Sequence, residues 1–382
     1  MSSLRFGTDV YAQRLKAAAE GTVAAGLAGL VITPGYDLRY LLGSQAQTFE
    51  RLTALVVPAS GAPTVVVPRM ELAALKESAV LELGLSVRDW VDGEDPYRMV
   101  ADALGGTADP VAGPVKTAVT DSMPALHLLP LADLLGVVPV LATDIIRRLR
   151  MIKDPAEIDA LRKAGAAIDR VHARVPEFLV AGRTEADVSA DIARAIIDEG
   201  HSEVAFITVG SGPNGANPHH ECSDRVLRDG DVVVVDIGGP YDPGYNSDST
   251  RTYSIGTPDP EVARQYAILQ EAQRAAVAAV RPGVTAEQID AAARDVLAAA
   301  GLADAFVHRT GHGIGLSVHE EPYIVSGNDI PLQEGMTFSV EPGIYFPGYW
   351  GARIEDIVVV TADGVMSLNE RPHELLVVPA QS

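Results

Sequence analysis

Apolar and polar positions alternate between two periodicities along the first third of the chain. Residues 9–29 carry apolar side chains at helical spacing, and residues 30–33 form a short apolar run before a Pro-Gly turn. Residues 52–57 and 64–67 are two runs rich in β-branched residues, separated by SGAP, which predicts a hairpin. This mixture of helices and strands continues to about residue 146 and predicts an α/β domain.

Two features mark the limits of this first domain. Near its start, the polar cluster Tyr36, Asp37, Arg39 and Tyr40 follows the Pro-Gly turn, and we interpret it as a solvated loop. After a basic stretch, residues 154–157 (Asp-Pro-Ala-Glu) combine an acidic N-cap, a proline at the first helical position and a glutamate placed for a capping box. We therefore predict an N-terminal α/β domain over residues 1–146 and a second domain over residues 147–382.

The second domain contains a repeat. Residues 182–187 (GRTEAD) and 283–288 (GVTAEQ) each place a threonine N-cap three positions before an acidic or amide residue, and the two threonines, Thr184 and Thr285, lie 101 positions apart. Each segment follows a long helical pattern and precedes β-rich sequence. The matching order predicts an internally duplicated α+β domain, in which a cleft between the two halves is a natural place for a site.

Composition narrows the class of protein. The chain has 382 residues and a formal net charge of −21, which argues against nucleic acid because it lacks the basic excess that phosphate binding requires. One cysteine excludes an internal disulfide and fits a reducing compartment. The N-terminus has no apolar core of the signal-peptide type, and no run approaches the roughly 18 apolar residues of a membrane span. We therefore expect a cytoplasmic protein that does not bind a membrane.

Two carboxylates flank a predicted turn in the sequence DVVVVDIGGPYDPGYNSDSTRT. Val232–Val235 is a buried strand that ends on Asp236, and glycines and prolines over residues 238–244 predict a turn. Asp248 follows, and residues 251–255 have the character of a return strand. A hairpin of this kind would bring Asp236 and Asp248 toward each other.

Three further residues of ligand type lie downstream. His312 belongs to HRTGHGIGLSVHEEP, whose glycines predict a loop leading into a strand. Glu341 follows the predicted strand at residues 337–340, and Glu355 lies near the start of the strand predicted at residues 352–360. Because residues two apart on a strand share a face, Arg353 lies on the same face as Glu355.

Four carboxylates and one imidazole cannot be buried together without compensation, because like charges repel strongly in a low dielectric. Two divalent cations would neutralise four carboxylates, and oxygen-rich ligation with one histidine suits Mn²⁺, Co²⁺, Fe²⁺ or Zn²⁺. Two such ions about 3.5–4 Å apart would hold a bridging water and lower its pKa. The alternative is that the five residues lie at unrelated strand ends.

Four blocks, DIGGPYDPGYNSDSTRT, HRTGHGIGLSVHEEP, SVEPGIY and RIEDIVVV, resemble in order the signatures of the pita-bread metallopeptidases, a family that includes Xaa-Pro dipeptidase (prolidase) and Xaa-Pro aminopeptidase. The resemblance extends from residue 145 to about residue 375, and GYDLRYLLG resembles the N-terminal domain of the creatinase and prolidase branch. It implies a duplicated α+β catalytic domain after a smaller α/β domain, and a homodimer. It also implies a dinuclear metal centre, with Mn²⁺ preferred. The ligands it implies are Asp236, Asp248, His312, Glu341 and Glu355.

The resemblance assigns further roles to residues outside the ligand set. His219, rather than the neighbouring His220, lies where the family keeps a substrate-binding histidine. His308 and His319 match second-shell or substrate-contacting histidines, and Arg353 matches the arginine of the RIED block. The interval of twelve between the two aspartates is one residue longer than usual, and the turn is where an extra residue costs least.

These expectations describe a metal-dependent exopeptidase that hydrolyses the Xaa-Pro bond of dipeptides or short peptides by attack of a metal-bridging hydroxide. Glu341 would shuttle the proton, His219 or His319 would stabilise the oxyanion, and His308 and Arg353 would shape the end that receives proline. Arg353 would grip the substrate carboxylate or, alternatively, form an ion pair with a metal carboxylate. The alternative functions are a creatinase-like amidinohydrolase and a non-catalytic module that binds peptides or proteins.

Overall fold

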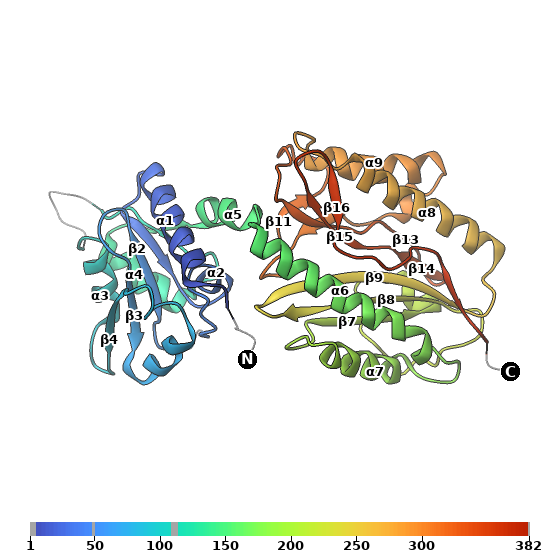
Figure 1. Cartoon of the computed structure of the whole chain (residues 1–382), viewed down its shortest axis with the longest axis horizontal. Coiled ribbons are helices and arrows are strands. Elements are labelled where there is room, and N and C mark those ends of the chain that lie inside the picture. Colours follow the sequence, from blue (N-terminus) through green and yellow to red (C-terminus); the bar gives the residue numbers. More distant parts are fainter. Residues whose placement is uncertain (1–4, 48–49, 108–113, 381–382) are drawn as a thin grey trace. The chain divides into compact units, whose positions relative to one another are not determined.

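A computed structural model describes residues 5–47, 50–107 and 114–380 (Figure 1). The chain divides into two compact units, one formed by Arg5–Arg150 and the other by the residues from Met151 onward. The domain boundary expected between residues 146 and 147 stays a prediction. Residues 1–4, the start of the N-terminus for which no signal peptide is expected, lie outside the described residues.

A mixed six-stranded sheet forms the centre of the first unit, in the order β4-β3-β2-β1-β5-β6. β1 pairs antiparallel with β2 and parallel with β5, so helices must connect the parallel strands. The elements of this unit are α1 (Thr8–Ala24), β1 (Gly29–Ile32), α2 (Tyr36–Leu42), β2 (Ala54–Pro58), β3 (Thr64–Pro68), η1 (Arg69–Glu77), β4 (Ser86–Trp90), α3 (Pro96–Ala103), β5 (Ala118–Val119), α4 (Ala125–Leu135), β6 (Val140–Leu141) and α5 (Thr143–Met151).

The polar cluster that follows the first turn is not a solvated loop, and that interpretation was wrong. It forms the helix α2, in which Asp37 and Tyr40 are buried. The side chain of Arg150 pairs with the Asp37 carboxylate at 2.8 Å, and Tyr40 donates a hydrogen bond to the carbonyl of Leu149. These partners lie more than a hundred residues away in sequence, so the local pattern could not indicate that the cluster would be buried.

Three sheets and four long helices form the second unit. The sheets have the orders β17-β9-β8-β7, β11-β10-β12-β15-β16 and β13-β14. The helices α6 and α7 pack on the sheet that contains β8 and β9, and α8 and α9 pack on the sheet that contains β12 and β15 (Figure 1). The elements are α6 (Pro155–Phe178), α7 (Glu185–Asp198), β7 (Phe206–Ser211), η2 (Gly212–Ala216), β8 (Val232–Tyr241), β9 (Tyr245–Ile255), α8 (Pro260–Ala279), α9 (Ala286–Ala299), η3 (Ala303–Ala305), β10 (Gly311–Gly313), β11 (Glu320–Ile324), β12 (Thr337–Val340), β13 (Gly343–Phe346), β14 (Trp350–Arg353), β15 (Asp356–Val360), β16 (Val365–Ser367) and β17 (Leu376–Val378).

The predicted duplication is visible in the helix starts. Thr184 and Thr285 are the N-caps of α7 and α9, and both form the predicted capping box. Each threonine also makes an isolated β-bridge to a later segment, Thr184 with Val226 and Thr285 with Pro331. The two halves therefore repeat not only a local helix start but also its tertiary attachment.

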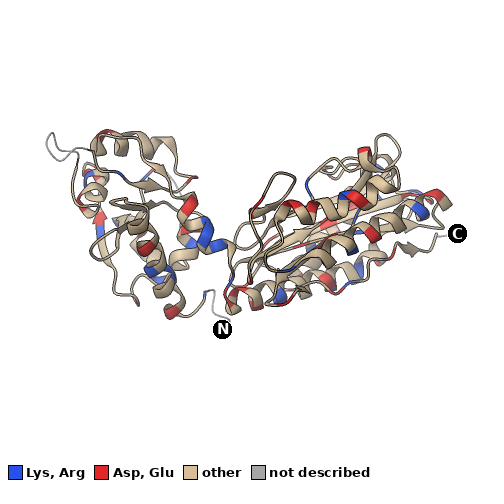
Figure 2. Cartoon of the chain, turned by 90° about the horizontal axis from the view of Figure 1, so that it is seen from above, with Lys and Arg blue, Asp and Glu red and all other residues tan. Residues whose placement is uncertain are grey.

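Acidic and basic side chains are interspersed along the helices of both units (Figure 2). In the ranges that the structure describes, no helix combines the length and the apolar character needed to cross a membrane.

Candidate metal centre

The hairpin of β8 and β9 places the two predicted aspartates on one face. Asp236 pairs with Thr250 and Gly238 pairs with Asp248 in the antiparallel register. Because Asp236 and Gly238 are two apart on one strand, the side chains of Asp236, Asp248 and Thr250 all point to the same side.

The turn of this hairpin comes later than predicted, because β8 continues through Gly238 and Gly239 to Tyr241. At Gly238 a Cβ atom would lie 2.5 Å from the ring of Phe206, and at Gly239 it would overlap the carbonyl oxygen of Glu203. These glycines therefore allow close packing against the strand.

His312 and Glu341 come from the neighbouring sheet. His312 lies in the middle of the short strand β10, rather than in a loop, and Glu341 directly follows β12. Ser339 connects them, because its hydroxyl accepts the N–H of His312 at 3.0 Å and donates to the Glu341 carboxylate at 3.1 Å. Glycines flank His312 because a Cβ at Gly311 would overlap the carbonyl of Ser339.

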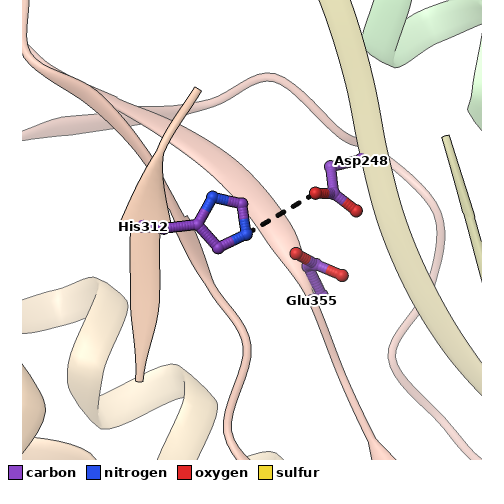
Figure 3. Close-up of side chains that lie close together, drawn as sticks. All are labelled: Asp248, His312 and Glu355. Atoms are coloured by element: carbon purple, nitrogen blue, oxygen red, sulfur yellow. Dashed lines mark ion pairs between the residues drawn. The ribbon is translucent and has the colours of Figure 1, made fainter. Parts of the chain in front are cut away.

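Glu355 joins the two sheets. It forms an isolated β-bridge with Thr250 in the gap between β14 and β15, and the Thr250 hydroxyl donates to its carboxylate at 2.7 Å. The predicted strand from residue 352 to 360 is therefore interrupted at this residue. Figure 3 shows Asp248, His312 and Glu355 converging from three separate segments, and one potential ligand atom from each lies within 4.8 Å of the others.

The imidazole of His312 is arranged as a neutral ligand. Its Nδ1–H donates to the carbonyl of Gly313 at 3.0 Å, so Nε2 carries the lone pair and faces Glu341 at 3.3 Å and Asp248 at 3.6 Å. Burial, followed by the nearby His319, lowers the pKa of His312 to about 3. A neutral imidazole with a fixed tautomer is the form that binds metal ions.

The carboxylates carry more negative charge than the protein around them compensates. Burial raises the pKa of Glu341 to about 7 and raises the pKa values of Asp248 and Glu355, which also repel neighbouring carboxylates. One buried oxygen of Asp236 and one of Glu355 have no hydrogen-bond partner among the described residues. All four carboxylates and His312 line one cavity of about 910 Å³. Unpaired buried oxygens and a neutral imidazole form a donor set that fits divalent cations.

Arg353 is buried in the wall of this cavity and is held by several partners. Its guanidinium donates to the Asp236 carboxylate at 2.6 Å, the Thr250 hydroxyl at 3.1 Å and the Tyr345 hydroxyl at 2.7 Å. It also donates to the carbonyl of Pro218 at 3.5 Å. The ion pair with a metal carboxylate, which was the alternative interpretation of this residue, is therefore present.

His308 lies beside Tyr345 and has both ring nitrogens engaged. Its Nδ1–H donates to the carbonyl of Arg309 at 2.7 Å, and its Nε2 accepts the Tyr345 hydroxyl at 2.8 Å. Burial, followed by the charge of Arg353, lowers the pKa of His308 to about 4. A chain of hydrogen bonds thus runs from Arg353 through Tyr345 to a neutral His308.

The remaining predicted histidines have different surroundings. His319 lines the cavity with its ring centroid 4.0 Å from that of His312. His219 also lines the cavity and is exposed, whereas the neighbouring His220 is bound through Nε2 to the buried carboxylate of Glu185 at 2.7 Å. The structure thus leaves the imidazole of His219, rather than that of His220, exposed to the cavity.

Three residues that position the site were missed at the level of sequence: Thr250, Tyr345 and Glu185. Thr250 follows Asp248 by two positions on a predicted strand, so its shared face was a usable signal. Tyr345 and Glu185 gave no such signal, because their partners His308 and His220 lie more than thirty positions away.

Residues 159–362 match the family model of metallopeptidase family M24, and residues 14–152 match the creatinase/prolidase N-terminal domain. The probable dipeptidase PepE of Mycobacterium tuberculosis is 74% identical over 379 residues, which are 99% of this chain and 100% of that protein. The Xaa-Pro dipeptidase of Lactobacillus helveticus is 37% identical over 90% of this chain and 92% of its own length. The crystal structure of dipeptidase PepE from Mycobacterium ulcerans has 75% identity and a TM-score of 0.94, covering 98% of this chain and 100% of that one. The predicted fold class, a duplicated pita-bread domain after a smaller α/β domain, is confirmed.

Proposed function

The chain belongs to metallopeptidase family M24, and from this membership we propose that it is a dinuclear Xaa-Pro dipeptidase. The substrate class is suggested by the relatives, of which one is named a probable dipeptidase and another an Xaa-Pro dipeptidase. The observation that carries the proposal is the convergence of Asp248, His312 and Glu355 in a cavity that also contains the carboxylates of Asp236 and Glu341.

We propose that these five residues hold two divalent cations. Once bound, the ions would activate a water molecule for attack on the peptide carbonyl and stabilise the negative charge that develops on it. The protein contributes oriented ligands: the Thr250 hydroxyl orients Glu355, Ser339 orients Glu341, and Arg353 orients Asp236. The native metal is proposed to be Mn²⁺, with Co²⁺, Zn²⁺ or Fe²⁺ as alternatives.

Glu341 is suited to move the proton that the leaving nitrogen requires. Burial raises its pKa to about 7, so its proton affinity lies near neutral pH in the metal-free site. His219 and His319 line the same cavity, and we propose that one of them donates a hydrogen bond to the substrate oxyanion. His308 is proposed to act through Tyr345, because both of its nitrogens are already engaged.

A cleavage panel tests this function. The metal-loaded protein is incubated with an Xaa-Pro dipeptide, an Xaa-Pro-Yaa tripeptide, Met-Ala-Ser and creatine, each with Mn²⁺, Co²⁺ or Zn²⁺. We expect release of free proline from the dipeptide, loss of that activity with a chelator, and no reaction of creatine. Activity that survives complete metal removal would contradict the proposed chemistry. A cytoplasmic location and a homodimer remain predictions.

A further inference from the structure

Two arginines line the cavity among the described residues, and only one of them is committed to the protein. Arg353 is 3% exposed and makes four hydrogen bonds, one of them to Asp236. Arg309 is half-buried, and in the part of the chain that the structure describes no hydrogen bond or ion pair involves its guanidinium. Its recorded contact is with the ring of Tyr323, whose centroid lies 4.5 Å from the guanidinium carbon.

Tyr323 places this guanidinium close to the candidate metal ligands. Tyr323 on β11 is the direct cross-strand partner of His312 on β10. Side chains directly opposite in an antiparallel pair have their Cβ atoms about 4.5–5.5 Å apart. The guanidinium stacked on Tyr323 therefore lies about one side chain away from His312. Burial and then the charge of Arg309 lower the pKa of His319, so this charge is felt inside the cavity.

A stacked guanidinium without a carboxylate partner is an unusual feature of a cavity that contains five acidic side chains, Asp236, Asp248, Glu341, Glu355 and Glu221. Stacking on an aromatic face fixes the plane of the guanidinium and leaves its N–H groups directed outward. Those N–H groups match the two oxygens of a carboxylate in a bidentate arrangement.

We propose that Arg309, held by Tyr323, binds the free C-terminal carboxylate of the substrate and selects dipeptides over longer peptides. This inference rests on the proposed function, because it concerns the substrate of the same site. In an Xaa-Pro dipeptide the carboxylate lies one residue beyond the scissile bond, at the length scale that separates Arg309 from the ligand cluster. In a longer peptide that position is a neutral amide, which offers one acceptor oxygen and no charge.

The test compares two substrates that differ only at the carboxylate. The metal-loaded protein and the variants Arg309→Met and Arg309→Lys are assayed with an Xaa-Pro dipeptide and with its C-terminal amide. Methionine retains the side-chain length but removes the charge, and lysine retains the charge but removes the planar fork. The matched control is Arg174→Met on α6, whose guanidinium also faces an aromatic ring, that of Phe178 at 5.8 Å, but does not line the cavity.

We expect Arg309→Met to raise KM for the dipeptide by about ten- to a hundredfold, the usual range for a lost hydrogen bond to a charged group. KM for the amide should change by less than about threefold, Arg309→Lys should be intermediate, and Arg174→Met should match the unmodified protein. Equal changes in KM for both substrates, or an unchanged KM for the dipeptide, would overturn the proposal.

A binding measurement separates failure of this inference from failure of the proposed function. Calorimetry is performed with a dipeptide analogue whose scissile amide is reduced to a methyleneamine, and with its carboxamide counterpart. If the protein cleaves no Xaa-Pro peptide but loses affinity for the carboxylate analogue alone in Arg309→Met, the proposed activity fails and the carboxylate site stands. If both analogues bind Arg309→Met as they bind the unmodified protein, the carboxylate site is refuted.

Discussion

Replacement of Arg353 by lysine separates its two interpretations, a grip on substrate and a support for the metal site. The lysine ammonium can keep the charge opposite Asp236, but it cannot also reach the Thr250 and Tyr345 hydroxyls, which now accept from Nε and Nη1. A hydrogen bond from a charged group contributes about 1.5–3 kcal/mol, so two lost bonds correspond to about 3–6 kcal/mol when counted in full.

Only part of that free energy should reach the metals. The ammonium recovers some hydration, and the Tyr345 hydroxyl keeps its partner His308. Loss of a group that orients a metal-binding carboxylate usually costs about 10–100-fold in metal affinity or activity, or about 1.4–2.8 kcal/mol. We therefore expect Arg353→Lys to lower Mn²⁺ affinity or kcat by that factor.

The assay measures Mn²⁺ binding by calorimetry and kcat and KM with an Xaa-Pro dipeptide and its amide. Because the effect passes through Asp236 and not through substrate, kcat/KM should fall by the same factor for both substrates. Arg309→Lys is the matched control, since the same substitution in the same cavity should discriminate between the two substrates. A rise in KM confined to the dipeptide, with metal binding unchanged, would show that Arg353 grips the substrate and that the reasoning from its hydrogen bonds is mistaken.

Three other changes probe the site and its supports. Glu355→Ala should abolish turnover and release at least one ion per chain, so an unchanged metal content by elemental analysis would remove Glu355 from the ligand set. Without metal, burial raises the pKa of Glu341 to about 7 from about 4.3 in the unfolded chain, so the native state binds the extra proton between these values. The stability of the metal-free protein relative to metal-free Glu341→Gln should therefore be highest below about pH 4.3 and fall as the pH rises toward 7; a difference independent of pH contradicts this. Burial would raise the pKa of Glu185, but hydrogen bonds from Ser211, Ser223 and His220 outweigh it and lower the pKa to about 2. Glu185→Gln turns one acceptor into a donor facing other donors, and urea unfolding should show a loss of about 3 kcal/mol or more, whereas a loss under 1 kcal/mol would mean that this network is dispensable.

Local chemistry determined the features that depend on neighbours in sequence. The capping boxes at Thr184 and Thr285 were predictable because a threonine and an acidic or amide residue three positions later satisfy the backbone of the same helix turn. The strand that carries Asp236 was predictable because a run of β-branched residues has few other stable environments. The spacing of carboxylates and His312 was enough to suggest a metal centre.

Tertiary structure decided the features that depend on partners far apart in the chain. Asp37 is buried because Arg150 compensates its charge, and the glycines after Asp236 continue a strand because Phe206 packs against them. The two cavity arginines are both charged and both near the ligands in sequence. Their roles differ because Asp236, Thr250 and Tyr345 surround Arg353, whereas Tyr323 offers Arg309 only an aromatic face. Sequence determines which groups can donate and accept hydrogen bonds, but only the packing of distant segments determines which of those groups remain available to a ligand.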